Sequence, residues 1–410
     1  MANASLSWLN LFVSDMQTGF GPFVPVRLAA AGWDPAMIGV VLSVGTVAAL
    51  LAQVPAGVIC DAISAKRGLT AGAIVAVMLA LVLVGTMPSP PFVIAAEAIQ
   101  GVAGVVLALA ITSITLGLAR QDRLGERLGS NLRFAAIGGA LGAAVLGIVG
   151  SHVSDTALFV SASGLGVLAL VALWFIRPAM MARAPLLTGH RAAQPLHLRG
   201  PLPHTRRLLT DRRLLMLMAC VVLFHLANAA MLPLAAGSLE RHLGMRADQV
   251  VSGALVISQL LTAVGSPWVG RLAQEVGRQP ILLVGFAMLP LRGLLFAIDG
   301  SPAFTLLAQV LDGITGASFG VLVPLMVADI THEGGRFNLA LGMVGLATGV
   351  GATVSNYVAG GIAAHMGTPV AFIGLAVVGL AATLLVAFAL PETRHMPVTP
   401  PKHPSELAPT

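Results

Sequence analysis

The chain has 410 residues, of which 57% are hydrophobic and only 10% are charged, and its formal net charge is +6. A soluble protein carries about 25% charged residues, so a soluble fold of this length could not cover its surface with so few charges. The basic residues fall in short loops between apolar runs and not on one polar face. This excludes a nucleic-acid-binding surface and favours a role in membrane orientation.

Twelve apolar runs are long enough to cross a membrane, which requires about 20 mostly apolar residues each. The first run carries Asp15 and Gln17 and has no basic segment before it, so we expect a retained helix and not a cleavable signal sequence. In chain order, the spans are predicted at 6–30, 35–60, 68–87, 91–119, 132–151, 156–176, 214–237, 249–269, 281–298, 302–330, 339–366 and 369–390.

These runs predict an all-α integral membrane fold built from two six-helix bundles. Nineteen of the 23 Lys and Arg residues fall on one side of this topology, which places both termini in the cytoplasm. Abundant Gly and scarce Lys favour a bacterial inner membrane. The predicted parts are an N-terminal bundle at 1–176, a cytoplasmic linker at 177–213, a C-terminal bundle at 214–391 and a Pro-rich, disordered tail at 392–410.

The two halves of the chain repeat each other at an offset of 212 or 213 residues. Pro55 near the end of the second span is matched by Pro267 in the eighth, and Gly101 in the fourth by Gly313 in the tenth. Parallel repeats of this kind build a central site between two bundles in many transporters.

The loop after the second span resembles a motif of the major facilitator superfamily, G-x-L-A-D-R-x-G-R-K. It reads Gly57-Val-Ile-Cys-Asp61-Ala-Ile-Ser-Ala-Lys66-Arg67, and the second half repeats it as Gly270-Arg-Leu-Ala-Gln-Glu-Val-Gly277-Arg278. The resemblance spans the whole chain. It implies the twelve-helix fold of that family and transport by alternating access, with two bundles that rock about a central site.

The same resemblance implies a gate on the cytoplasmic side. Asp61 would meet either the positive N-terminus of a helix or an Arg across the bundle interface, and glycine lets helices approach closely. The alternative is that the basic residues of these loops only anchor the topology. The predicted gating residues are Gly57, Asp61, Lys66, Arg67, Gly270, Gly277 and Arg278.

Two weaker matches bear on the branch of the family. Glu97-Ala-Ile-Gln100-Gly101 is similar to the R-x-x-Q-G motif of proton antiporters, but Glu97 stands in place of the Arg. The fifth span also lacks the Gly-Pro pair of drug antiporters. The sequence Pro391-Glu392-Thr393 resembles the P-E-T that follows the last helix in several branches, sugar porters included. None of these motifs identifies the substrate.

Charged side chains at mid-bilayer cost about 2.5–3.5 kcal/mol, so they should face a cavity or a partner. Asp15 lies near mid-depth in the first span, where Asn10 and Gln17 belong to a neighbouring polar stripe, and we favour cavity lining for these residues. Glu97 shares a face of the fourth span with Gln100. We predict that either Asp15 or Glu97 carries the coupling proton, because a carboxyl group taken out of water favours its protonated form.

Further polar residues lie in the second half, and each has two open interpretations. His225 and Asn228 are three residues apart and either bond to each other or contact the substrate. Arg292 and Asp312 fall at similar depths in consecutive spans and form either a structural ion pair or, for Asp312, part of the transport site. Asn356 is either a hydrogen-bonding group of the site or a contact between helices.

We therefore expect a secondary active transporter for a small-molecule substrate, coupled to protons and working as a monomer among membrane lipids. Efflux of an amphipathic compound is favoured, and the alternatives are uptake of a polar nutrient or organic acid and a transporter-like sensor without flux. An enzyme is not expected: we expect no catalytic motif such as H-E-x-x-H or G-x-S-x-G, and the polar loops are too short for a catalytic domain. Cys60 and Cys220 match no metal or redox spacing, so neither a metal nor a cofactor is expected.

Overall fold

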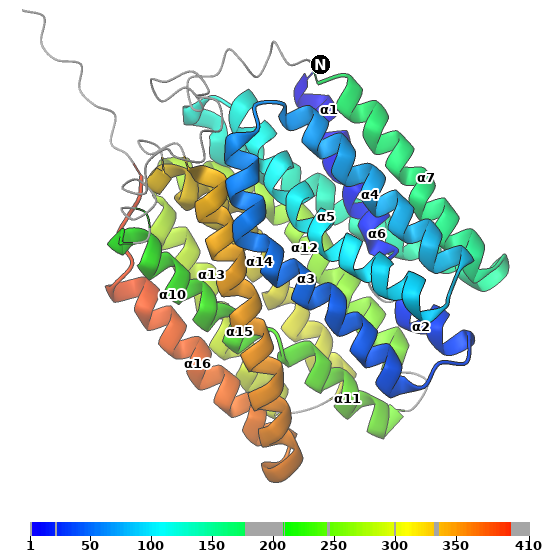
Figure 1. Cartoon of the computed structure of the whole chain (residues 1–410). Helices are drawn as coiled ribbons and strands as arrows, with labels where there is room; N and C mark the ends of the chain where they lie inside the picture. Colours follow the sequence, from blue (N-terminus) through cyan, green and yellow to red (C-terminus); the bar gives the residue numbers. More distant parts are fainter. Residues whose placement is uncertain are drawn as a thin grey trace, which may run out of the picture.

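The computed structural model describes residues 2–20, 23–176, 208, 210–243, 247–298, 301–331 and 336–394, and these form helices joined by short connections. The helices run roughly side by side, with the first half of the chain on one flank and the second half on the other (Figure 1). Most of the predicted linker and most of the predicted tail lie outside the described residues, and the last two residues of the predicted linker, Arg212 and Arg213, belong to a helix.

The first half contains six membrane crossings, and the second half repeats the arrangement. The helices of the first half are α1 (Ala2–Thr18), α2 (Phe23–Ala30), α3 (Pro35–Ala62), α4 (Lys66–Thr86), α5 (Pro90–Leu118), α6 (Leu124–His152) and α7 (Asp155–Trp174). Those of the second half are α10 (Arg212–Asn228), α11 (Met231–Leu243), α12 (Ala247–Glu275), α13 (Arg278–Ile298), α14 (Pro302–Thr331), α15 (Phe337–Met366) and α16 (Thr368–Phe388).

Eleven crossings within these ranges are long and apolar enough to span a membrane, and the pair α1–α2 makes the twelfth. The fold class predicted from the sequence is confirmed. The spans predicted at 6–30 and 214–237 are each divided into two helices: α1 ends at Thr18 and α2 begins at Phe23, and α10 ends at Asn228 and α11 begins at Met231, although 212–239 still forms one span. Proline accounts for the second break, because Pro233 has no N–H to donate to the carbonyl of Ala229, four residues earlier, and α10 ends at Asn228.

Two helices also extend beyond their apolar runs. Helix α6 begins at Leu124 and not at 132, and α12 continues to Glu275 and not to 269. Glu126 and Arg127 in the first case and Arg271 in the second are good helix formers, so the helix continues beyond its lipid-facing part. Hydropathy locates the apolar part of a helix and not its end.

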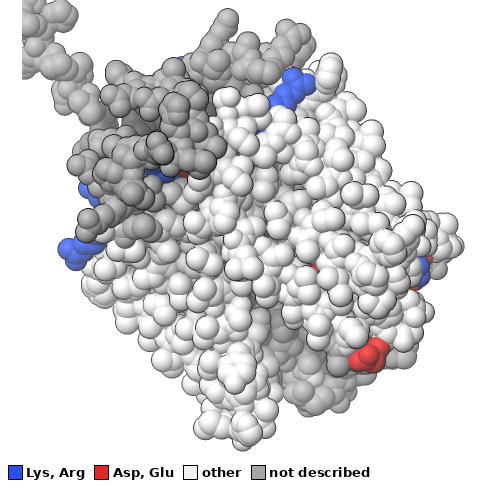
Figure 2. Space-filling model, viewed as in Figure 1, with Lys and Arg blue, Asp and Glu red and all other residues white. Residues whose placement is uncertain are grey.

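Each half has its own buried apolar cluster. One is made only of residues between Leu6 and Ile176, and the largest cluster draws mainly on residues between Leu214 and Leu390. Large apolar side chains such as Leu51 and Phe388 point outward, as lipid-facing residues do. The space-filling view has a broad uncharged face, with Lys, Arg, Asp and Glu near its ends (Figure 2).

The two halves meet mainly through two helix pairs, α3 with α15 and α6 with α12. In Figure 1, α3 and α15 lie side by side at the front of the molecule. The end of the molecule where α3 joins α4 and α12 joins α13 is called the motif end below. Here the backbones come very close, since a Cβ atom on Gly57 would lie 2.8 Å from the Cα of Leu339. Only glycine fits this contact.

Candidate functional site

A cavity of about 730 Å³ lies between the two halves. The first half contributes residues of α1, α3 and α5, and the second half contributes residues of α14 and α15. Its polar lining is made of amides, hydroxyls and one carboxyl group, and the rest is small or apolar. The polar lining residues are Gln17, Thr46, Gln53, Glu97, Gln100, Thr112 and Thr348.

Glu97 is the acid of this cavity. It projects from α5 toward α3, where its Oε2 atom occupies the space that a side chain at Gly45 would need. The residue is only 7% exposed, and its Oε1 atom has no hydrogen-bond partner in the described structure. The amide oxygen of Gln100, one turn further along α5, is also buried without a partner. Unpartnered buried polar atoms in a cavity wall are the groups that a ligand or a proton would satisfy.

A second chamber of about 260 Å³ adjoins the cavity and lies nearer the motif end. The two share Gln17 and Thr112 among their lining residues. The predicted polar stripe of α1 lies here: Asn10 and Gln17 both line the chamber. Asn131 of α6 closes it with a hydrogen bond from Nδ2 to Thr115 Oγ1 at 2.8 Å.

Asp15 lies on a different face of α1 from this stripe. Its carboxyl group packs against Gly142 of α6, in the space that a side chain there would fill. Its Oδ1 atom is buried and has no hydrogen-bond partner within the part of the chain that is described. A helix turns about 100° per residue, so Asp15 points between α1 and α6 while Ser14 faces the chamber.

In the second half, Arg292 and Asp312 form the ion pair that their depths predicted. Arg292 Nη1 lies 2.7 Å from Asp312 Oδ1, and Ser258 donates to the other carboxylate oxygen at 2.7 Å. Arg292 is 2% exposed and also donates to Asn228 Oδ1, at the end of α10. This network joins α10, α12, α13 and α14 within one bundle.

The predicted bond between His225 and Asn228 is wrong. His225 Nδ1 donates to the carbonyl of Val221 at 3.0 Å, because the amide of Asn228 is taken by Arg292. The imidazole ring packs edge-on against Phe319, which lines the cavity, with 5.0 Å between ring centroids. His225 therefore supports the cavity wall from behind.

The remaining predicted groups lie away from the cavity. Asn356 is exposed on α15, on the apolar outer surface. Cys60 and Cys220 are buried free thiols. Across the described ranges, no group of three His, Cys, Asp or Glu residues could hold a metal ion.

At the motif end, the carboxylate of Asp61 crosses from the first half to the second. Its Oδ1 atom accepts hydrogen bonds from the backbone N–H of Asn338 at 3.0 Å and from the side-chain amide at 2.7 Å, and Oδ2 accepts from Leu339 N–H at 2.9 Å. These N–H groups belong to the first turn of α15. Asp61 therefore meets a positive helix N-terminus, one of the two partners considered from the sequence. Ser113 of α5 adds a bond to Asn338 Oδ1 at 2.6 Å.

The basic residues of the first motif loop stay within their own half. Arg67 lies over the ring of Trp174 on α7, with its guanidinium carbon 5.1 Å from the ring centroid. Lys66 is the first residue of α4, close in sequence to Asp61. On the second loop, Arg271 reaches across to Glu126 of α6 at 3.3 Å, but both side chains are exposed.

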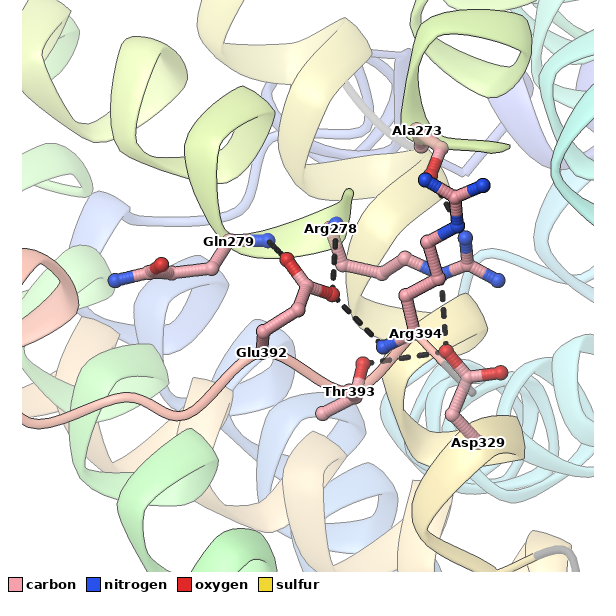
Figure 3. A network of polar contacts seen from close by, with 7 residues as sticks. All are labelled: Ala273, Arg278, Gln279, Asp329, Glu392, Thr393 and Arg394. Carbon is pink, nitrogen blue, oxygen red and sulfur yellow. Dashed lines mark hydrogen bonds and ion pairs between the residues drawn. The ribbon is translucent and has the colours of Figure 1, made fainter. Parts of the chain in front are cut away.

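Arg278 of the second motif loop is buried and bonds within its own half (Figure 3). Its Nε lies 3.0 Å from Asp329 Oδ2, and its Nη1 donates to the carbonyl of Ala273 at 2.7 Å. Thr393, after the last helix, donates to the same oxygen of Asp329 at 3.2 Å. Gly277 has φ +121°, a conformation that only glycine adopts without strain, and this turn aims the arginine inward.

Glu392 ties the chain after α16 to the start of α13 (Figure 3). Its carboxylate accepts backbone hydrogen bonds from Arg278 at 3.0 Å, Gln279 at 3.1 Å and Arg394 at 2.8 Å. Partial burial raises the pKa of Glu392, but these backbone N–H groups outweigh it and hold the pKa below its ordinary value of 4.5. The first residues of the predicted tail are therefore bonded to the bundle.

Sequence reasoning missed Asn338, Asp329 and Phe319. Asp329 carried a signal, since it is an acid at the end of an apolar run, two residues before the last residue of α14. Asn338 and Phe319 carried none, because their roles depend on helices far away in the chain. The expected absence of a G-x-S-x-G hydrolase motif is wrong, because Gly316–Gly320 has this sequence. It is continuous α-helix and Ser318 is 2% exposed, so the exposed strand–turn–helix serine of that chemistry does not form.

The described geometry agrees with the comparisons to known proteins. The model of the Major Facilitator Superfamily matches residues 6–289 and 217–410. The chain belongs to the major facilitator superfamily. An uncharacterized MFS-type transporter of Mycobacterium tuberculosis strain H37Rv is 35% identical over 393 residues, which are 95% of this chain and 93% of that protein.

Two further comparisons place this superfamily member more broadly. The Escherichia coli tetracycline resistance protein, class B, is 28% identical over 141 residues, 34% of each chain. The crystal structure of the transporter FucP in the outward conformation has a TM-score of 0.74 at 12% identity, covering 95% of this chain and 98% of FucP. The latter likeness concerns the fold alone.

Proposed function

We propose that this secondary transporter exports a small amphipathic compound in exchange for protons, with Glu97 as the proton-carrying group. The observation that carries the proposal is a buried, unpartnered carboxyl group in the wall of the cavity between the halves. Such a group is unstable as a bare anion, so it either binds a proton or pairs with a cation. Asp15 is also buried, but it faces α6 and is the second candidate.

The motif end is assigned to the cytoplasm, because most basic residues of the chain lie on that side. The bonds of Asp61 and the close approach of Gly57 then hold the cytoplasmic side closed, which corresponds to an outward-facing state. Efflux is favoured over uptake by the mostly apolar lining of the cavity and by the partial similarity to a tetracycline resistance protein.

The test is proton movement in proteoliposomes that hold the purified protein, followed with a pH-sensitive dye during a screen of candidate solutes. Wild-type protein should move protons when an exported solute is added, and Glu97→Gln should abolish this. Asp122→Asn is the matched control, since it removes an exposed acid outside the cavity.

Other results would redirect the proposal. Coupled proton flux that survives Glu97→Gln but not Asp15→Asn would move the proton site to α1. Solute flux without protons would remove the coupling. Ligand binding without flux of any solute would indicate a sensor, and solute accumulation on the cytoplasmic side would indicate uptake.

A further inference from the structure

The charge inventory of the site restricts the class of substrate. Among the residues that line the cavity and the adjoining chamber, all from the described part of the chain, Glu97 is the one ionisable side chain. Two arginines of the bundle helices have other partners. Arg292 pairs with Asp312, and Arg133 donates to the carbonyl of Ala263 at 3.1 Å. An anionic substrate would therefore meet a carboxyl group and no compensating cation.

The groups around Glu97 leave it without competition from other titrating side chains. The helices packed against α5 are α1, α3, α4, α6 and α15. None of their titratable residues lines the cavity or the chamber. These residues are Asp15, Cys60, Asp61, Lys66, Arg67, Glu126, Arg127, Arg133, His152, Tyr357 and His365.

The surroundings of Glu97 favour its pairing with a cation. It is more than nine-tenths buried, its Oε1 atom is unpartnered, and Gly45 opposite presents no side chain. A carboxylate in such a place is stabilised only by a positive partner or by protonation. The lining of the cavity contains no cationic side chain. The positive partner of Glu97 therefore has to come from the ligand, or from the solvent as a proton.

The rest of the wall suits an apolar body that carries the charge. Phe319 faces the cavity, and its ring is stacked on Phe224 with centroids 4.2 Å apart and held edge-on by His225. A fixed aromatic ring attracts cations through its face and also buries apolar surface. The volume of about 730 Å³ lies within the range of about 300–1,000 Å³ that is typical of sites for drug-sized molecules.

The adjoining chamber suits an uncharged polar group. It offers the side chains of Asn10, Ser14, Gln17 and Thr112, and the Oδ1 atom of Asn131 is buried without a partner. These groups match hydroxyl and carbonyl oxygens and give nothing to neutralise a second charge. The two spaces together would hold a molecule with one charged apolar part and one neutral polar end.

We propose that the substrate is a lipophilic organic monocation whose charge pairs with Glu97 in place of the coupling proton, with a neutral hydroxyl- or carbonyl-bearing end in the chamber beside Ser14. This inference rests on the proposed function and names its substrate class. Substrate and proton exclude each other, because the cavity offers one carboxylate to both.

The test uses two probes of nearly the same shape and opposite charge, tetraphenylphosphonium and tetraphenylborate. Their equilibrium binding to purified wild-type protein is measured between pH 5 and 9. The cation should bind most tightly at high pH. At lower pH, where protons occupy the site, its binding should release about one proton and its affinity should fall by about tenfold per pH unit. The borate should not bind. Equal binding of both probes, or cation binding that is independent of pH, would overturn the proposal without any variant.

Variants then locate the site. Glu97→Gln should weaken the phosphonium by about 30-fold or more, since it leaves the charge buried without its partner. Asp122→Asn should change nothing. Unchanged binding in a folded Glu97→Gln protein, checked by its elution and thermal unfolding, contradicts the assignment. For the chamber, Ser14→Ala and Thr112→Val together should weaken a quaternary ammonium with a hydroxylated tail and leave its alkyl-tailed analogue unaffected.

The outcomes separate this inference from the proposed function. If vesicles show Glu97-dependent proton exchange for neutral or anionic solutes and the phosphonium does not bind, the substrate class is wrong and the coupling stands. If the phosphonium competes with protons at Glu97 but no solute is transported, the site stands and the transport proposal fails.

Discussion

The two motif loops occupy equivalent places in the repeat but make opposite kinds of contact. In the loop after α3, Asp61 crosses the interface and receives three hydrogen bonds from the start of α15. In the loop after α12, the residue 213 positions later is Gln274, beside Gly125 at the start of α6, and its amide nitrogen is buried without a partner in the described structure. The two halves therefore repeat the same backbone arrangement at this position without repeating its polar bonds.

The charge that the second loop does hold is directed inward. Arg278 is buried against Asp329 within its own bundle, and Glu392 fixes the backbone around it. The first loop thus bridges the halves by hydrogen bonds that must break when they separate. The second reaches across with the exposed pair Arg271–Glu126, while its buried charges form an internal bracket that can stay intact. Mutations in the first should change conformation, and mutations in the second should change stability.

The largest effect is expected from breaking the bracket. Arg278→Met leaves Asp329 buried without its cation, and losing one partner of a buried pair costs about 3–5 kcal/mol. We expect a clear fall in the thermal unfolding temperature in detergent, with partial recovery in Arg278→Met/Asp329→Leu. Arg271→Met, which removes an exposed arginine from the neighbouring helix end, is the control. If Arg278→Met shifted the distance between the halves without loss of stability, the second loop would not be an internal bracket.

The next effect is expected from Asp61→Asn. Hydrogen bonds to a charged group contribute about 1.5–3 kcal/mol, so the closed motif end should lose about tenfold or more in population. Spin labels at Ser64 and Val276, both exposed, report the distance between the halves after the two buried cysteines are replaced. The bridge assignment fails if the distance distribution matches that of the wild type, or if Asp122→Asn alters it equally.

A purely steric change at the same interface should act in the same direction. Gly57→Ala places a methyl group 2.8 Å from Leu339 Cα, and overpacking of this kind costs about 1–3 kcal/mol. We expect the same spin labels to show a wider motif end and a lower thermal stability of the closed state. Gly68→Ala is the matched control, since a Cβ there meets nothing within 4 Å. Identical behaviour of the two variants would remove the packing argument.

The smallest effect is expected at Glu392, whose side chain is exposed. Because its pKa is lowered in the folded state, its contribution is present above pH 4.5 and is lost as the pH falls through the lowered value. The unfolding temperature of the wild type should exceed that of Glu392→Gln at neutral pH by the equivalent of less than about 1 kcal/mol, and the two should converge in acid. A constant difference at every pH would mean that the carboxylate charge is not responsible.

Local patterns predicted what depends on neighbours in the chain. Apolar runs located the crossings, and equal depth paired Arg292 with Asp312. The break after Asn228 could also have been predicted, because Pro233 is visible in the sequence. The predictions that failed depend on how a helix is rotated about its axis and on which distant residues it meets. Asp15 and Ser14 are adjacent in the chain but face different neighbours.

Long-range partners were beyond local patterns. The bond between Asp61 and Asn338 joins residues 277 positions apart, and no periodicity in either helix encodes it. The same holds for Phe319. In the sequence it is an ordinary apolar residue of α14, and only the assembled fold places it in the same cavity as Glu97 of α5. A single sequence predicts the helices and their polar faces. The helix that each polar face contacts can be identified only in the assembled bundle.

The single carboxyl group in the cavity also determines what can power the proposed exchange. If one monovalent cation leaves for each proton that enters, no net charge crosses the membrane, and the transmembrane voltage does no work on the cycle. The pH gradient alone then sets the limit, at about tenfold accumulation of substrate per pH unit. In a cell that lost its pH gradient but kept its voltage, this protein could not export its substrate against a concentration gradient.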